Sequence, residues 1–418
     1  MNETFYHILP NGIRIVHRPT QSPVVYAGLM TGVGTRHERP EENGMAHYIE
    51  HCVFKGTEHY TARQIINKIE GIGGEINAYT TKEETTFYAA ALKQHFRTTL
   101  HLLADMILHP TFPKRETDKE LTVILDEIES YNDSPSDLIY DDFESLLFHG
   151  SSLALPILGT KKTLRRISTS PEQPLQWMAN HYSPERMVLF VTGDISPKQM
   201  VAHAERELGH FTQMQPIDNQ TVQSHNMIHG GDADSAPQYV SYRRHTHQTH
   251  LMFGARAYEI GNEKQLAMYL LNNILGGGSM SSRLNLSLRE QRGLVYTVES
   301  QYTPLSDTGY WNVYMACEPP HKDACMELAM NELQRLRDTR LTSAQFQHAI
   351  RQLEGQMAIS AENQENNALA MGKQMLYHNV APTWQETFQR ICELTPADLQ
   401  EVAQEVYENS NIHVLQYD

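Results

Sequence analysis

The sequence predicts an α+β protein of two duplicated domains, each a mainly antiparallel sheet packed with helices. Three observations support this prediction. The chain has 418 residues, which exceeds one hydrophobic core and suits two domains of about 200 residues each. Strand patterns are grouped with helical patterns rather than alternating strictly with them, which favours antiparallel or mixed sheets. The order of these patterns in the first half recurs in the second half.

The first half begins with strand patterns. Residues 12–17 alternate between polar and apolar types, and residues 24–33 are largely apolar, so both segments read as strands. Residues 45–55 are expected to be helical. Residues 75–92 are rich in Thr, Tyr and Phe, which is typical of paired strands. The later patterns in this half predict two long helices and a strand, at residues 94–108, 115–131 and 187–191.

The second half follows a stretch of different composition. Residues 213–240 are rich in Gln, Asn, Ser and Asp and show little apolar periodicity, so we predict a linker between domains at 1–212 and 241–418. Both halves end alike, because Tyr182 and Tyr407 each precede a short polar segment and an apolar strand. The elements expected after the linker are strands at 249–256, 295–303 and 309–317 and helices at 262–275, 321–338 and 342–361.

Composition excludes several classes of protein. Lys and Arg total 34 against 50 Asp and Glu, a formal net charge of −16, so we expect no nucleic-acid or anionic-membrane partner. No apolar run approaches the roughly 18 residues of a membrane helix. The first residues lack the features of a signal or transit peptide, so a cytoplasmic location is expected. The four cysteines are scattered without a CxxC pair, which predicts neither a disulfide framework nor a cysteine zinc site.

The sharpest motif is HYIEH at residues 47–51. On a helix, His47 and His51 lie on one face and can both reach a tetrahedral metal ion. Glu50 can reach the same site without being a ligand, so it is the candidate base for a water molecule at the metal. This order inverts the common HExxH motif and matches the HxxEH signature of inverzincins. The alternative is a solvated helix face, since 22 histidines make a chance match about one in ten.

A catalytic zinc site also needs a third protein ligand. The predicted helix at 115–131 offers several carboxylates beside apolar residues. Spacing alone does not choose among them, and an acidic solvated face explains the same pattern. The open candidates are Glu127, Asp126, Glu129 and Glu120.

A family resemblance selects one of them. Residues 34–38 (GTRHE), 43–47 (NGMAH) and 54–57 (FKGT) together resemble the pitrilysin/insulysin zinc peptidases, especially the short bacterial members and mitochondrial processing peptidase. The resemblance implies that Glu127 is the third ligand. It also implies that Glu120 is a supporting acid, to which we assign the orientation of a ligand histidine.

The resemblance extends to substrate-binding segments. Residues 73–80 (GGEINAYT) are similar to the family's edge strand, where a peptide adds as a further strand and touches Asn77 and the backbone of Ala78. A simpler role for Asn77 is to satisfy a turn. Residues 275–296 are similar to the family's second-half signature, which implies that Arg289 and Tyr296 contact the substrate carbonyl region. The triple glycine there is not followed by Gly-Lys-Ser/Thr, so nucleotide binding is disfavoured.

Together these features predict a metalloendopeptidase with one Zn²⁺ per chain. Residues 1–212 would be the catalytic zinc domain, and residues 241–418 a non-catalytic repeat that supplies Arg289 and Tyr296. By analogy with the family, the protein would be a homodimer that encloses short unfolded peptides in a clamshell chamber, each site being completed by the partner chain. The alternatives are a subunit of a heterodimeric peptidase, a non-catalytic assembly subunit, and a zinc hydrolase of non-peptide substrates. The presence of every expected ligand and of Glu50 argues against an inactive subunit.

Overall fold

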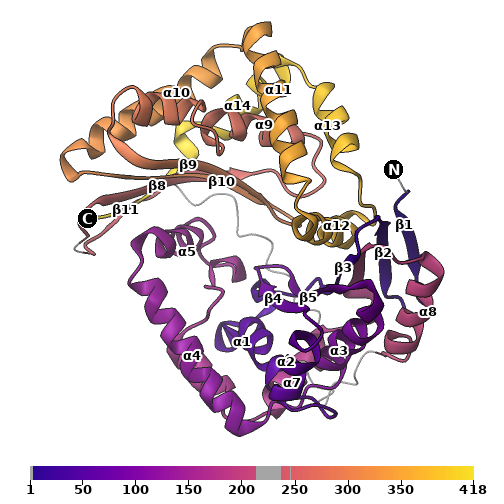
Figure 1. Cartoon of the computed structure of the whole chain (residues 1–418). Coiled ribbons are helices and arrows are strands. Elements are labelled where there is room, and N and C mark those ends of the chain that lie inside the picture. The colour runs from indigo at the N-terminus through magenta and orange to yellow at the C-terminus, as the bar shows by residue number, and fades with distance from the viewer. Residues whose placement is uncertain (1–2, 213–236, 245) are drawn as a thin grey trace. The chain divides into compact units, whose positions relative to one another are not determined.

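The computed structural model describes residues 3–212, 237–244 and 246–418 (Figure 1). Contacts divide the chain into two compact units, and each unit takes one segment from the opposite half of the chain. The predicted linker at 213–240 lies mostly outside the described residues. The predicted domain boundaries, 1–212 and 241–418, remain a prediction. Unit 1 comprises Met1–Glu129, Leu155–Ile228 and Ala361–Pro382, and unit 2 comprises Ser130–Ala154, His229–Ser360 and Thr383–Asp418.

Unit 1 is built on a six-stranded sheet with the strand order β1-β2-β6-β3-β5-β4. Only the pair β2 and β6 is parallel, and the other neighbouring strands are antiparallel. Strand β4 therefore forms one edge of the sheet. The strands are β1 Phe5–Ile8, β2 Arg14–Pro19, β3 Val24–Thr31, β4 Glu75–Thr80, β5 Thr85–Leu92 and β6 Met187–Gly193.

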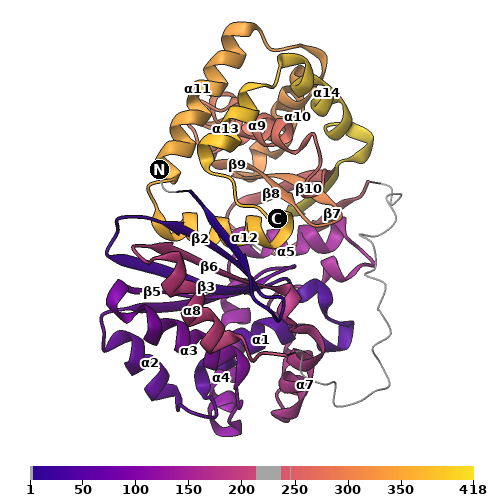
Figure 2. The ribbon, with the colours of Figure 1, turned by 90° about the vertical axis from the view of Figure 1, so that its right-hand side faces the viewer.

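Helices cover both faces of this sheet (Figures 1 and 2). Alternate side chains of β3 point to opposite faces, so Leu29 joins the core that includes α1 and α3, whereas Met30 packs in a separate core with α12. Both residues are buried, which explains the continuous apolar run in this strand. The helices are α1 Met45–Cys52, α2 Ala62–Glu70, α3 Phe96–Leu108, α4 Lys114–Asn132, α6 Lys161–Ile167, α7 Glu172–His181, α8 Pro197–Leu208 and α12 Gln364–His378.

Unit 2 repeats this plan on a five-stranded sheet of order β7-β11-β8-β10-β9. The one parallel pair is β11 and β7. Helices α9, α10 and α14 contribute to the core on one face, and α5 packs on the other face. The strands are β7 Tyr239–Tyr242, β8 Thr249–Ala257, β9 Val295–Pro304, β10 Gly309–Cys317 and β11 His413–Tyr417, and the helices are α5 Pro135–Leu147, α9 Gln265–Gly276, α10 Lys322–Asp338, α11 Ser343–Ser360, α13 Trp384–Cys392 and α14 Pro396–Val406.

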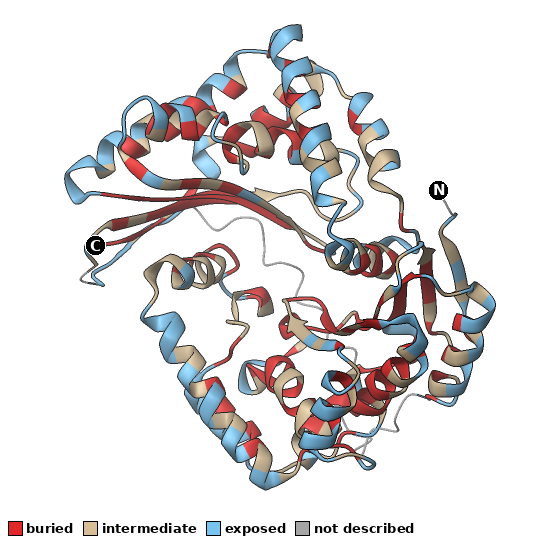
Figure 3. Ribbon diagram, in the orientation of Figure 1, coloured by how far each residue is buried: buried red, intermediate tan, exposed pale blue. Residues whose placement is uncertain are grey.

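The sequence patterns did not predict several helices, namely α2, α5, α6, α7, α8, α12, α13 and α14. Of these, α5 and α12 lie in the unit formed mainly by the opposite half of the chain. The apolar face of α5 is Ile139, Phe143 and Leu147, spaced four residues apart, and it packs against the sheet of unit 2. Helix α12 packs Met371 and Met375 against the sheet of unit 1. Each helix thus completes a sheet formed mainly by the other half of the chain. Figure 3 shows buried residues along the strands and on the sheet-facing sides of the helices.

The predicted fold class is confirmed. The two units have similar plans, each with a mainly antiparallel mixed sheet and helices on both faces. The strands and helices predicted at 75–92, 94–108 and 295–317 lie within a few residues of β4, β5, α3, β9 and β10. None of the described helices is both long and apolar enough to span a membrane.

Candidate metal centre

The candidate metal centre is built on α1, whose start is fixed by Glu38. The Glu38 carboxylate accepts hydrogen bonds from the backbone N–H groups of Gly44 at 2.8 Å and Ala46 at 2.7 Å. Gly44 precedes the helix with a φ of +91°, a conformation that glycine adopts without steric cost. Burial raises the pKa of Glu38 to about 8, although its hydrogen-bond donors act in the opposite direction. These hydrogen bonds anchor the first turn of α1 and help to fix which side of the helix faces Glu127.

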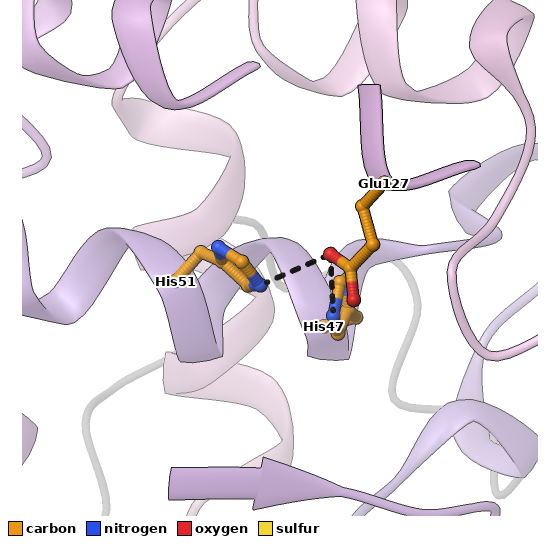
Figure 4. Close-up of side chains that lie close together, drawn as sticks. All are labelled: His47, His51 and Glu127. Carbon is orange, nitrogen blue, oxygen red and sulfur yellow. Dashed lines mark ion pairs between the residues drawn. The ribbon is translucent and has the colours of Figure 1, made fainter. Parts of the chain in front are cut away.

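His47 and His51 lie one turn apart on α1 and face Glu127 of α4 (Figure 4). The Nε2 atom of His47 lies 3.7 Å from Oε2 of Glu127, and Nε2 of His51 lies 3.5 Å from the same oxygen. The centroids of the two imidazole rings are 4.5 Å apart. Among the described residues, these three form the one group of His, Cys, Asp or Glu side chains arranged to hold a metal ion.

The donor atoms fit a tetrahedral zinc ion. Zinc bonds of about 2.0–2.2 Å in tetrahedral geometry place neighbouring donor atoms roughly 3.3 Å apart. The separations of 3.5 and 3.7 Å between the imidazole nitrogens and the Glu127 oxygen are close to that value. Two imidazoles and one carboxylate also form a three-ligand set of the kind found at catalytic zinc sites.

The pKa values of the two histidines shift in opposite directions. Burial, and next the nearby His51, lower the pKa of His47 to about 3, so its ring is neutral and able to coordinate a metal. The Nδ1 atom of His47 is buried without a hydrogen-bond partner among the described residues. Burial acts to lower the pKa of His51 too, but the hydrogen bond to Glu120 and the charges of Glu50 and Glu127 outweigh it and raise that pKa.

Glu120 lies on α4 two turns before Glu127 and connects the centre to a lysine. Its Oε1 atom lies 2.9 Å from Nδ1 of His51, and its Oε2 atom lies 2.7 Å from Nζ of Lys55. Burial acts to raise the pKa of Glu120, but the hydrogen bonds from His51 and Lys55 outweigh it and lower that pKa. The ionised carboxylate therefore favours the His51 tautomer with Nδ1–H, which leaves Nε2 free to coordinate.

Glu50 shares α1 with the two histidines and is partly buried. Burial raises its pKa, the hydroxyl of Thr80 and the charge of His51 oppose this shift, and the charge of Glu127 adds to it. Thr80 is the last residue of β4. Its partial burial beside His51 and Glu127 makes Glu50 a candidate general base.

The two residues predicted to bind peptide lie on β4, which is the edge strand beside α1. Asn77 is exposed, and its Oδ1 atom accepts a hydrogen bond of 2.9 Å from the backbone N–H of Ala78. Strand β4 pairs with β5 alone among the described residues. Its other edge is therefore open to backbone hydrogen bonds with a further strand.

Arg289 and Tyr296 lie in unit 2. Arg289 is on the π-helix η7, Asn285–Glu290, and Tyr296 is on β9. The guanidinium carbon of Arg289 lies 5.6 Å from the centroid of the Tyr296 ring, within range of a cation–π contact. The structure therefore brings these two residues together, and Tyr296 is 79% exposed.

Sequence reasoning missed three residues that support the centre: Glu38, Lys55 and Thr80. Glu38 and Lys55 lie in segments 34–38 and 54–57, whose resemblance to a family was noticed without a role for either residue. A carboxylate several residues before a helix that lacks a Ser, Thr, Asp or Asn cap was the available signal for Glu38. No sequence signal connects Thr80 to Glu50, because their proximity depends on the packing of β4 against α1.

Comparisons with known proteins identify the family of this chain. Residues 14–161 match the family model described as Insulinase (Peptidase family M16), and residues 168–353 match the Peptidase M16 inactive domain. A Bacillus subtilis protein described as an uncharacterized zinc protease is 34% identical over 368 residues, covering 88% of this chain and 86% of that protein. A Streptomyces coelicolor protein with the same description is 30% identical, covering 95% of this chain and 86% of that protein.

Two solved structures share the fold. A protease from Helicobacter pylori superposes with a TM-score of 0.90 at 19% identity, with full coverage of both chains. A structure from Pseudomonas fluorescens described as a peptidase M16 inactive domain gives a TM-score of 0.86 at 18% identity, covering all of this chain and 98% of that one. The family matches and the similarity to named zinc proteases establish that this chain belongs to peptidase family M16.

Proposed function

We propose that the protein is a zinc metalloendopeptidase that cleaves short unfolded peptides, with one zinc ion bound by His47, His51 and Glu127. The observation that carries the proposal is the approach of both imidazole Nε2 atoms to one oxygen of Glu127, at 3.7 and 3.5 Å. A structural ion pair does not require two imidazoles to converge on one oxygen. A three-ligand zinc site does require three donor atoms to lie roughly 3.3–3.6 Å from one another around one point.

Zinc at this position would polarise the scissile carbonyl and make water a stronger nucleophile at neutral pH. Glu50 acts as the general base that takes a proton from the attacking water and then gives it to the leaving amine. Glu120 holds His51 in its coordinating tautomer, and Lys55 keeps Glu120 ionised. The hydroxyl of Thr80 acts to lower the pKa of Glu50, against the effect of burial.

The peptide adds to the open edge of β4. Backbone groups around Ala78 would pair with the substrate as in an antiparallel sheet, and the side chain of Asn77 would turn from Ala78 to the peptide. This mode needs an extended chain, so folded proteins are poor substrates. Arg289 and Tyr296 would stabilise the substrate carbonyl through a cation and a phenol, a role that their mutual contact supports.

The assembly that we propose is a cytoplasmic homodimer that encloses a chamber, in which Arg289 and Tyr296 serve the zinc site of the partner chain. The match of residues 168–353 to a domain described as inactive supports the division into a catalytic part and a non-catalytic part. The alternatives are a subunit of a heterodimeric peptidase and a non-catalytic assembly subunit. Light scattering on the purified chain, combined with activity, separates the three.

The decisive test compares wild-type protein with Glu50→Gln by zinc analysis and hydrolysis of a quenched peptide panel. Both proteins should hold near-stoichiometric zinc, and the variant should turn over roughly a hundredfold more slowly or worse. Undiminished turnover in Glu50→Gln would remove the mechanism.

A complementation experiment tests the shared site. Arg289→Ala should impair hydrolysis and keep its zinc. Mixing it with Glu50→Gln should restore part of the activity, because one mixed site then has both intact residues. Absence of rescue despite demonstrated subunit exchange contradicts the shared site.

A further inference from the structure

We propose that unit 2 carries a second ligand site, a cationic pocket that binds a phosphoryl group. The pocket has a volume of about 270 Å³ and is lined by Arg283, Arg292 and Arg335 together with Glu332. The amides of Gln291 and Asn331 also line it. The site belongs entirely to unit 2 and contains none of the residues proposed to bind zinc or peptide.

The charge of the pocket favours a dianion. Three guanidinium groups face one carboxylate, which leaves a net positive charge of two. Glu332 lies 2.7 Å from Nη1 of Arg335 and 3.8 Å from Nη1 of Arg283, so it neutralises one arginine well and the other weakly. A phosphate dianion would balance the remaining charge, whereas a single carboxylate group would balance half of it.

Arg283 is the strongest evidence that the pocket can bind an anion. Its side chain is 22% exposed, and burial lowers its pKa. The 3.8 Å separation from Glu332 is too long for a hydrogen bond, and no described residue accepts a hydrogen bond from its guanidinium. An anion that enters the pocket can therefore accept hydrogen bonds from this guanidinium.

The other two arginines line the same pocket. Arg292 donates from Nη1 to the backbone carbonyl of Ser287 at 2.8 Å and to Oε1 of Gln291 at 3.4 Å, which positions its guanidinium. Arg335 is 68% exposed and projects from α10. The three guanidinium groups thus come from before η7, after η7 and from α10. Planar guanidinium forks match the oxygens of a phosphate group better than lysine does.

The size of the pocket limits the ligand. A volume of about 270 Å³ lies just below the range of roughly 300–1,000 Å³ typical of sites for drug-sized molecules. It suits free phosphate or a short phosphoryl chain. A ligand there would also touch η7, since Leu286 and Ser287 line the pocket and Arg289 lies on the same π-helix.

The test is calorimetric titration of the zinc-loaded, full-length protein with inorganic phosphate, pyrophosphate and acetate. We expect saturable binding of phosphate or pyrophosphate and no comparable binding of acetate. The tighter of the two phosphoryl probes distinguishes free phosphate from a phosphoryl chain as the preferred ligand. Acetate binding as tight as phosphate binding would overturn the proposal in favour of a carboxylate site.

Single-residue variants test whether phosphate binds in this pocket. Arg292→Ala and Arg335→Ala remove exposed side chains, and each should weaken phosphate binding about tenfold or more, as expected for the loss of a charge-assisted hydrogen bond. Arg283→Met should do the same. Arg351→Ala on α11, an exposed arginine outside the pocket, is the matched control and should not change the affinity.

Glu332→Gln provides a test by gain of binding. Removing the one pocket carboxylate frees Arg335 and raises the net charge of the site, so phosphate affinity should increase several-fold. Unchanged affinity in the three arginine variants, or phosphate binding that persists in Arg283→Met and disappears with zinc, would assign the phosphate to the metal centre and overturn the proposal. None of these measurements uses peptide hydrolysis. They therefore test the phosphoryl site independently of the proposed peptidase function.

Discussion

In the two units, comparable strands are followed by helices of very different composition. In unit 1 the helix after β3 is α1, which carries His47, Glu50 and His51. In unit 2 the helix after β8 is α9, whose 12 residues contain no His, Asp or Glu. Both helices are largely buried against their sheets. The plan of the fold therefore accepts either a polar, metal-binding helix or an apolar one.

The difference lies in how each helix satisfies its polar groups. On α9, Asn272 is buried and exchanges two hydrogen bonds with Ser300, one from Nδ2 to the carbonyl at 3.0 Å and one from the Ser300 hydroxyl. On α1, the histidines instead face carboxylates from a different helix, α4. The candidate metal centre thus depends on a second helix that supplies carboxylates. It does not follow from the sheet-and-helix plan that the two units have in common.

The largest effect should follow removal of a ligand. His51→Ala should weaken zinc binding beyond the roughly 10- to 100-fold typical of losing an outer partner, since a direct bond to the metal is lost. The matched control is His348→Ala on the exposed side of α11 in unit 2, which should keep wild-type affinity. Competition with a fluorescent zinc chelator measures both. Equal zinc affinity in the two variants would contradict the assignment of the metal site to unit 1.

A smaller loss is expected at Glu120. Glu120→Gln removes the negative charge that orients His51, and zinc affinity should fall by about 10- to 100-fold. Glu116→Gln on the same helix, where Glu116 pairs with Lys119 at the surface, serves as the control. The same chelator competition applies. If the two variants bind zinc equally well, Glu120 does not orient a ligand.

Substitution of two helix glycines, Gly372 in unit 1 and Gly355 in unit 2, compares how tightly helices pack in the two units. A Cβ at Gly372 on α12 would lie 2.6 Å from the ring of Phe190, whereas a Cβ at Gly355 on α11 would meet nothing within 4 Å. Phe190 is fully buried, so Gly372→Ala should destabilise the protein by about 1–3 kcal/mol. Gly355→Ala should stabilise it by up to about 1 kcal/mol. Urea unfolding midpoints measure both, and an unchanged midpoint for Gly372→Ala would show that α12 is not tightly packed on β6.

The smallest effect concerns pH. Burial, and next the positive charge of Arg186, lower the pKa of His37 in unit 1 to about 3. Because the folded-state pKa is below the unfolded value near 6.5, the stabilisation is complete above pH 6.5 and is lost as the pH falls toward 3. Between pH 6.5 and 5.5 the wild type should lose up to about 1 kcal/mol more than His37→Asn. Urea unfolding across this interval measures the difference, with His149→Asn, an exposed histidine of unit 2, as the control. Parallel curves for wild type and His37→Asn would contradict a neutral His37.

Many strands and helices could be predicted from the sequence because local patterns and tertiary packing agree. The Thr- and aromatic-rich segment at 75–92 became β4 and β5, and the periodic segment at 115–131 became α4. Helices α5 and α12 were not predicted, and each packs on a sheet formed mainly by the opposite half of the chain. No local pattern reveals that exchange.

The sequence by itself determined the composition of the site: HxxEH spacing puts two imidazoles and Glu50 on one helical turn, since residues four apart share a face. It left four acids open as the third ligand until a family resemblance chose Glu127. Only the tertiary structure decided that Glu127 faces both rings and that Glu120 bonds to His51, because α1 and α4 meet through packing that no local spacing encodes. The same holds for the arginine pocket, in which residues near η7 meet residues of α10.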